Sequence, residues 1–149
     1  MADTLPEQAQ VVIVGGGAVG CSIAYPLTKI GITDVLLLER KQLTCGTTWH
    51  AAGLVGQLRA TANMTKIAQY TAELFLELEE ETGQATGMKQ TGSIALATDI
   101  ERLEELQRGA SMARVFGLEV EEVSAEWIAE KYPVMHTDDI VGGVFLPRD

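Results

Sequence analysis

The sequence predicts an α/β fold that opens with a strand, a helix and a second, parallel strand. Val11–Val14 is a continuous apolar run, which is typical of a parallel strand covered on both faces. Ala18–Ile30 follows as a helix, and Gly31 stands where a helix commonly turns into the left-handed conformation. Val35–Leu38 then supplies the second strand.

The turn between the first strand and the helix contains glycines in the spacing G-x-G-x-x-G, at Gly15, Gly17 and Gly20. The first lets the chain turn sharply, the second lets the backbone approach a pyrophosphate, and the third lets the helix lie close to the sheet. Free N–H groups at the start of the helix, at Ala18 and Val19, would face that anion.

An acidic residue, Glu39, ends the second strand nineteen positions after Gly20. A carboxylate there accepts hydrogen bonds from adenosine ribose hydroxyls and disfavours a 2′-phosphate, which argues against NADP. Together the glycines and the acid predict a Rossmann-like βαβ unit that holds a dinucleotide. The motif alone does not choose between NAD and FAD.

Farther along the chain, strand and helix patterns no longer repeat the βαβ order. The predicted elements are a helix over 62–81, strands over 91–97, 118–123 and 140–146, and helices over 98–116 and 124–131. The apolar face of the first of these helices is predicted to comprise Met64, Ile67, Ala68, Thr71, Leu74, Phe75 and Leu78. We expect residues 1–82 to be the N-terminal part of the nucleotide-binding domain and 83–149 to be the start of an α+β substrate domain, in an incomplete chain.

Composition excludes several classes of partner. The chain has 149 residues, a formal net charge of −10 and a pI near 4.6, so no basic patch is available for nucleic acid or anionic lipid. No apolar run is long enough to span a membrane. Two separated cysteines and an N-terminal stretch without a basic leader predict a cytoplasmic protein.

A more specific signal follows the second strand, in Glu39-Arg40 and in the string Cys45-Gly-Thr-Thr-Trp-His-Ala-Ala-Gly-Leu54. These residues resemble the FAD-dependent amine dehydrogenases that include dimethylglycine and sarcosine dehydrogenase, within the D-amino-acid-oxidase-like superfamily. The resemblance continues through 91–97, 127–133 and 142–147 and so covers most of the chain. It implies an FAD-binding fold.

The resemblance also implies which residues contact FAD. His50 maps to the histidine to which relatives attach the flavin covalently, and neutral imidazole is a competent nucleophile near neutral pH. The alternative for His50 is a loop histidine that touches the flavin without a bond. Further implied cofactor contacts are Arg40, Gly46, Thr47, Thr48, Ala51, Ala52, Gly53 and Leu54. Catalytic residues are not identifiable in these 149 residues.

The implied reaction is hydride transfer from an N-methyl amine to flavin, giving an iminium that releases formaldehyde or passes a one-carbon unit to tetrahydrofolate. Electrons would leave to an electron-transferring flavoprotein or to oxygen. Three alternatives stay open: another FAD-dependent amino-acid oxidase or dehydrogenase without covalent flavin, a non-catalytic regulatory member of the same family, and a fragment that is inactive alone.

Overall fold

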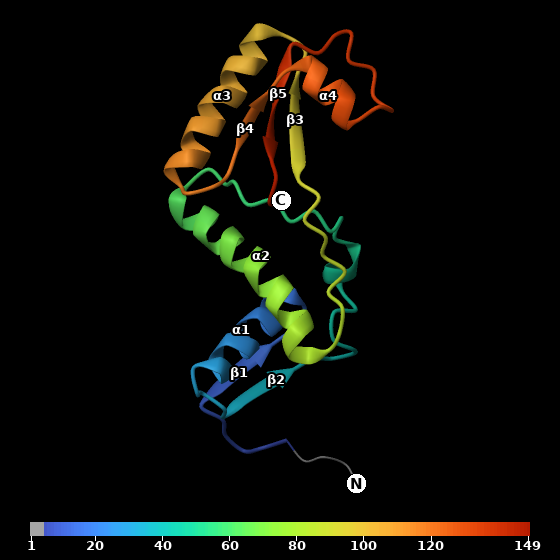
Figure 1. Ribbon diagram of the computed structural model, residues 1–149. Helices are drawn as coiled ribbons and strands as arrows, with labels where there is room; N and C mark the ends of the chain where they lie inside the picture. Colours follow the sequence, from blue (N-terminus) through green and yellow to red (C-terminus); the bar gives the residue numbers. More distant parts are fainter. Residues whose placement is uncertain (1–4) are drawn as a thin grey trace. The chain divides into compact units, whose positions relative to one another are not determined.

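The computed structural model describes residues 5–149, which form two compact units divided between Leu54 and Val55 (Figure 1). The first unit contains β1 (Val11–Val14), α1 (Ala18–Lys29), β2 (Val35–Leu38) and a 3-10 turn over Thr47–His50. The second contains α2 (Ala62–Thr82), β3 (Ser93–Ala97), α3 (Ile100–Val115), β4 (Glu121–Val123), α4 (Ala125–Lys131) and β5 (Gly142–Leu146). Among the described residues, no helix is both long and apolar enough to cross a bilayer.

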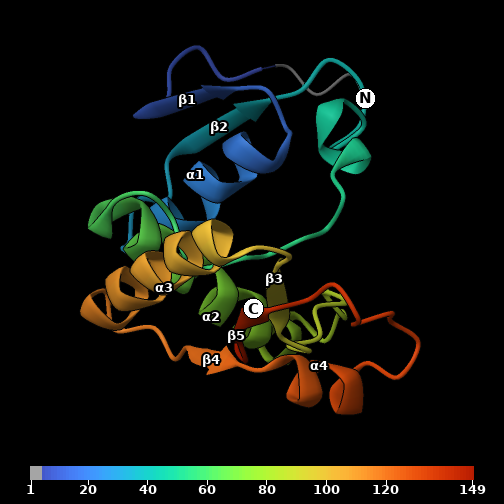
Figure 2. The same ribbon diagram turned by 90° about the horizontal axis from the view of Figure 1, so that it is seen from above.

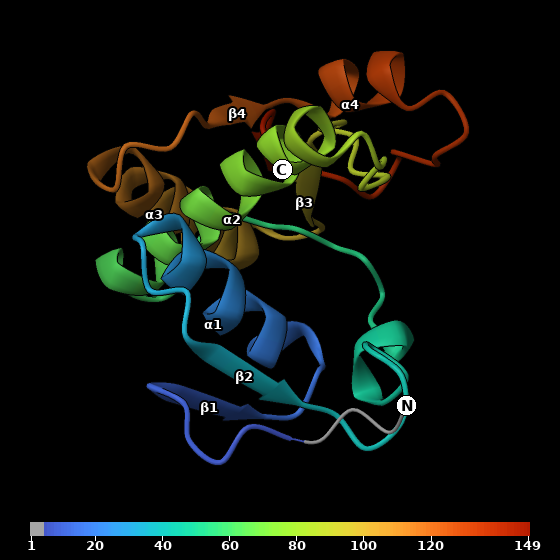
Figure 3. The same cartoon turned by 90° about the horizontal axis from the view of Figure 1, so that it is seen from below.

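The first unit is the predicted βαβ arrangement. β1 and β2 pair in parallel, from Val11 opposite Val35 to Val14 opposite Leu38, and α1 packs on one face of the pair (Figure 3). Only Ile13 of β1 is buried, whereas Val12 is 52% and Val14 83% exposed. The expectation of a strand covered on both faces is therefore wrong for this unit, since α1 covers one face of a two-stranded pair.

The second unit contains an antiparallel sheet in the order β3-β5-β4, with β5 in the centre. Successive residues of β5 point to opposite faces. Val144 packs with Ala110 and Ala113 of α3, and Phe145 packs with Ile128 of α4. The two helices consequently lie on opposite sides of the sheet (Figure 2).

Side-chain caps define the helix starts in this unit. Asp99 caps α3 by accepting a hydrogen bond from the Arg102 N–H at 2.7 Å, so the helix begins at Ile100 and not at residue 98 as predicted. Ser124 caps α4, as its sequence predicts. Gly117 follows α3 with a φ of 80°, the left-handed value expected there.

α2 has the predicted extent, and most of its predicted apolar face is partly buried, namely Ala68, Thr71, Leu74, Phe75 and Leu78; the departures lie near the start of the helix. Met64 and Ile67 are 52% and 60% exposed, while Thr65 and Ala72 are buried. The Thr65 hydroxyl accepts from the Arg59 N–H and donates to the Arg59 carbonyl, at 3.1 and 3.3 Å. Both hydrogen-bonding roles of the Thr65 hydroxyl are thus satisfied locally. Thr65 can therefore be buried where the apolar pattern predicted that its neighbours would be buried.

The compact units divide at 54/55, whereas the sequence placed a functional boundary at 82/83. Contacts place α2 with the antiparallel sheet that follows it, in the unit that begins at Val55. The division at 54/55 is defined by contacts within the chain, whereas the boundary at 82/83 separates residues expected to bind the cofactor from residues expected to form the substrate domain. The assignment of 1–82 to the FAD-binding domain and 83–149 to the substrate domain stays a prediction.

Lys131, at the end of α4, covers two aromatic rings. Its Nζ lies 4.1 Å from the ring centroid of Phe145 and 4.8 Å from that of Trp127. We expect Lys131→Gln to lower the free energy of unfolding by about 0.5–1 kcal/mol, the usual magnitude for an exposed cation–π contact. Urea denaturation measures this, with Lys131→Arg as the charge-retaining control. Equal stability of Lys131→Gln and the parent would contradict the prediction.

Candidate dinucleotide site

An open cavity of about 660 Å³ lies at the carboxyl ends of β1 and β2, within the first unit. Of the residues predicted to bind a cofactor, it brings together Gly15, Gly17, Ala18, Val19, Gly20, Glu39, Arg40, Gly46, Thr47, Thr48 and Ala51. His50, the last residue of the 3-10 turn, and Ala52, Gly53 and Leu54, which come soon after it, do not line it. The sequence did not predict the lining residues Lys41 and Thr44, which stand in a loop with no motif of their own, or Cys45, which belongs to the quoted string but was assigned no cofactor contact.

The glycine spacing has the geometric causes expected of it. Gly15 has a φ of 108°, a conformation that residues with a Cβ rarely adopt. A Cβ on Gly20 would overlap the Gly15 carbonyl oxygen and stand 3.3 Å from Ile13 Cγ2. A Cβ on Gly17 would lie 3.1 Å from the Thr48 hydroxyl. Glycine is thus required where the helix approaches the strand and where the turn meets the next loop.

Gly16 is a further position in the turn that contacts Glu39 and that the sequence did not assign to the site. A Cβ there would stand 3.0 Å from Glu39 Cβ and would crowd the end of Leu43. The Gly16 N–H donates to Glu39 Oε2 at 2.8 Å. The signal was present in the run of three consecutive glycines, of which the motif explains two.

Glu39 is held against the glycine turn as an ionised acceptor. Besides the bond from Gly16, its Oε1 accepts from the Lys41 N–H at 3.0 Å. These backbone N–H groups, Gly16 first, hold the pKa of the Glu39 carboxyl below its ordinary value. Each carboxylate oxygen retains a second lone pair, so the group can also accept from a ribose hydroxyl.

The same contacts predict how stability depends on pH. Because the folded-state pKa of Glu39 is lowered, its contribution is present above the ordinary glutamate pKa of about 4.3 and is lost as pH falls through the lower folded value. We expect Glu39→Gln to reduce the melting temperature at neutral pH. The difference in melting temperature between the parent and the variant should become smaller as the solution is acidified. Thermal melts across that pH range measure this difference, and a difference independent of pH would contradict the prediction.

Thr48 connects the 3-10 turn to α1. Its hydroxyl oxygen accepts from the N–H of Ala18, the first residue of the helix, at 2.9 Å. The turn is closed by the Ala51 N–H, which donates to the Thr48 carbonyl at 3.2 Å. The segment after β2 therefore contains one ordered turn, placed beside the N-terminus of α1.

His50 stands at the end of this turn with an exposed imidazole. Its ring stacks on that of Trp49, with centroids 4.0 Å apart and the planes tilted by 34°. His50 is therefore an exposed residue at the end of an ordered turn beside the cavity.

The residues of this cavity fit a dinucleotide. Glycines allow the close backbone approach, the N-terminus of α1 presents N–H groups, and Glu39 presents an ionised acceptor. The arrangement provides a pyrophosphate position beside α1 and a ribose position beside Glu39.

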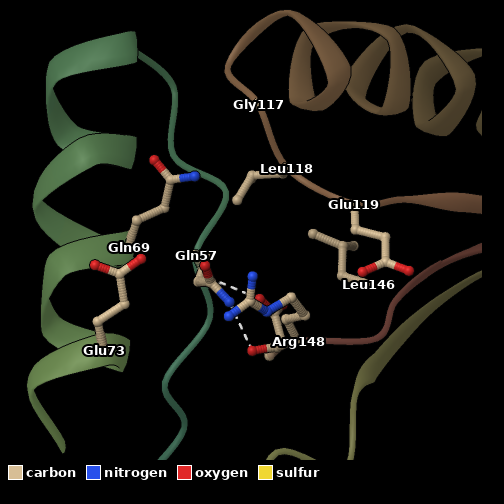
Figure 4. Close-up of a pocket in the computed structure, with 9 residues that line it drawn as sticks. Gln57, Gln69, Glu73, Gly117, Leu118, Glu119, Leu146 and Arg148 are labelled. Carbon is tan, nitrogen blue, oxygen red and sulfur yellow. Dashed lines mark hydrogen bonds between the residues drawn. The ribbon is translucent and has the colours of Figure 1, made fainter. Parts of the chain in front are cut away.

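A second, smaller hollow lies in the other unit, between α2, the loop that joins α3 to β4, and the end of β5 with the residues after it (Figure 4). Its volume is about 90 Å³, room for a few water molecules. Gln57 is 7% exposed, and its Nε2 donates to the Arg148 carbonyl at 2.6 Å. Asp149 accepts from the Gln57 N–H and from the Ser93 hydroxyl, at 2.9 and 2.6 Å. These bonds join segments of the unit, and the hollow is too small for an amino acid together with a flavin.

Comparison with known proteins agrees with this geometry. Residues 10–149 match the family model described as FAD dependent oxidoreductase, DAO. The chain is 41% identical to human sarcosine dehydrogenase, mitochondrial, and 43% identical to dimethylglycine dehydrogenase, mitochondrial, from Rattus norvegicus, over 97% and 96% of its length. It is also 43% identical, over 97% of its length, to the mitochondrial pyruvate dehydrogenase phosphatase regulatory subunit of Mus musculus.

Among solved structures, L-proline dehydrogenase from P. horikoshii matches 97% of the chain with a TM-score of 0.88 and 27% identity. The chain spans 38% of that protein and only 16–17% of the three curated relatives.

The comparisons correct one expectation. The three relatives above are named as mitochondrial proteins, so the prediction of a cytoplasmic protein is wrong. Acidic composition and a low cysteine content are properties of the folded region, whereas cellular location is specified by separate targeting segments.

The α/β fold and the expected resemblance are confirmed, since the match extends beyond the glycine motif to nearly the whole chain. The chain belongs to the DAO family of FAD-dependent oxidoreductases.

Proposed function

We propose that the full-length protein containing this chain uses FAD to oxidise an N-methyl amino acid of the sarcosine or dimethylglycine type. The observation that carries the proposal is the cavity in which the glycine turn, Glu39 and the Thr48 turn converge. The relatives named sarcosine and dimethylglycine dehydrogenase support the substrate class.

The chain's own residues have distinct parts in holding FAD. Glu39 would accept the adenosine ribose hydroxyls, and the Val19 N–H would donate to the pyrophosphate, which Ala18 would line while its own N–H stays bonded to Thr48. The remaining proposed contacts are Gly15, Gly17, Gly20, Arg40, Gly46, Thr47, Thr48, Ala51, Ala52, Gly53 and Leu54. Their lack of bulky charged side chains, Arg40 excepted, suits close approach of a ligand to the backbone.

Bound flavin supplies an acceptor for the hydride removed from the N-methyl carbon. The amine nitrogen lone pair forms the C=N bond of the resulting iminium. Water then adds to that carbon, and cleavage of the C–N bond gives formaldehyde and the demethylated amine. In the full-length protein, transfer of the one-carbon unit to tetrahydrofolate would be an alternative fate, and an electron-transferring flavoprotein or oxygen would be the electron acceptor.

His50 is the proposed point of covalent attachment. A ring nitrogen of His50 would hold the flavin at its 8α-methyl carbon. Exchange of the imidazole N–H and one methyl C–H for the C–N bond would be a two-electron oxidation, with the electrons passing to the electron acceptor and the two protons to water. The exposed imidazole on an ordered turn supports this role, because a nucleophile must reach the ligand without first unfolding its loop.

The proposed activity is tested on the full-length protein by incubation with sarcosine, dimethylglycine and glycine in the presence of an artificial electron acceptor. We expect formaldehyde and the demethylated amine in equal amounts from an N-methyl substrate. Oxidation of glycine with no formaldehyde from either N-methyl amine would favour another amino-acid oxidase.

A second candidate function is a non-catalytic regulatory role, favoured by the 43% identity to a phosphatase regulatory subunit. Bound FAD with no oxidation of any of the three amines would support this alternative.

A further inference from the structure

We propose that Thr48 is a positioning residue: it caps α1 from outside the helix and thereby fixes the turn that presents His50. The inference rests on the proposed attachment of flavin at His50. It goes beyond contact with the cofactor. Thr48 would hold the turn that carries the flavin-attachment residue against the helix whose N-terminus faces the pyrophosphate position.

The N-terminus of α1 lacks a cap of its own. Gly17 occupies the capping position and makes no side-chain hydrogen bond to the helix. The first N–H groups of a helix have no partner within it and need an external acceptor. The Thr48 hydroxyl, thirty residues later in the chain, accepts from the Ala18 N–H at 2.9 Å.

The residues beside this hydrogen bond leave space for the Thr48 hydroxyl. A Cβ on Gly17 would stand only 3.1 Å from the Thr48 oxygen, so the glycine leaves the space that the hydroxyl occupies. Thr48 is partly buried, whereas its neighbours Trp49 and His50 are exposed. Thr48 is therefore the member of the turn that packs inward.

Two short contacts hold His50 in the turn that begins at Thr48. The Ala51 N–H closes the turn on the Thr48 carbonyl at 3.2 Å, and Trp49 stacks on the imidazole with ring centroids 4.0 Å apart. His50 lies between the donor and the acceptor of the closing bond. Release of the Thr48 side chain would free the turn and with it the imidazole.

Three variants of the full-length protein test the link. Thr48→Val keeps the shape and removes the acceptor, whereas Thr48→Ser keeps the hydroxyl. Thr28→Val is the matched control: it removes a threonine hydroxyl that donates to the Tyr25 carbonyl at 2.8 Å, near the other end of α1. FAD is added to each apoprotein, and flavin that resists denaturation is measured over time. The Kd for ADP is measured separately.

We expect Thr48→Val to slow covalent attachment by about three- to tenfold, the effect of losing one neutral hydrogen bond. The Kd for ADP should rise by a smaller factor than the attachment rate falls, because Thr48 is one of many proposed nucleotide contacts, whereas its hydroxyl is the side-chain acceptor that holds the turn. Thr48→Ser and Thr28→Val should behave as the parent does. An unchanged attachment rate in Thr48→Val, or parallel losses of the same size in attachment rate and ADP affinity, would overturn the inference.

Failure of the proposed function is distinguishable from failure of this inference. If the parent protein holds no denaturation-resistant flavin, attachment at His50 fails, and amide hydrogen exchange of residues 46–52 decides the inference alone. Faster exchange in Thr48→Val than in the parent and Thr28→Val supports the anchoring role. Equal exchange in all three proteins contradicts it.

Discussion

Gly20→Ala is expected to abolish retention of FAD by the full-length protein and to lower the free energy of unfolding by about 3 kcal/mol, at the upper end of overpacking effects. The added Cβ would overlap the Gly15 carbonyl oxygen, which is backbone and has no rotamer to escape into. α1 must then move away from β1, and its N-terminal N–H groups leave the pyrophosphate position. Urea denaturation and the flavin absorbance of the purified protein measure the two effects.

Gly109→Ala is the matched control. Gly109 lies inside α3, and a Cβ there meets no atom within 4 Å, so alanine removes the conformational cost of glycine without a clash. We expect a gain of up to about 1 kcal/mol and full retention of flavin. Retention of FAD by Gly20→Ala at the parent's level would contradict the role given to the glycine turn.

His50→Ala is expected to eliminate flavin that stays with the polypeptide after denaturation, since no imidazole nitrogen remains to hold the 8α carbon. Non-covalent binding should survive, because Glu39 and the glycine turn are unchanged. Flavin fluorescence on a denaturing gel and the intact mass of the full-length protein measure both states.

His136→Ala is the control for that experiment, because His136 belongs to the other unit and follows α4. It should keep the parent's covalent flavin. A parent protein whose flavin separates completely on denaturation would contradict attachment at His50 while leaving FAD binding intact.

Local patterns predicted much of the fold. The apolar runs of β1 and β2, the glycine after α1 and the Ser124 cap of α4 depend on neighbours in sequence, and the structure has them where expected. The burial of Thr65 near the start of α2 could not be predicted in the same way. Burial of Thr65 depends on a hydrogen-bond exchange with Arg59, which precedes the helix and has no apolar signature.

The candidate site likewise contains residues that the sequence predicted and contacts that it did not predict. Gly15, Gly20 and Glu39 follow from a motif whose spacing is itself the geometric requirement. The spacing of the motif does not include Gly16 or Lys41; both contact Glu39 through backbone N–H groups, and at Gly16 the closeness of Glu39 and Leu43 also leaves no room for a side chain. The Thr48–Ala18 bond joins positions thirty residues apart and becomes apparent only when the chain is folded.

The most direct test of the central claim is the visible spectrum of the purified full-length protein before and after anaerobic addition of sarcosine or dimethylglycine. We predict an oxidised flavin spectrum that is bleached by an N-methyl amine and restored by an electron acceptor. A protein without a flavin spectrum would contradict the cofactor assignment, and a flavin bleached by neither amine would contradict the proposed reaction.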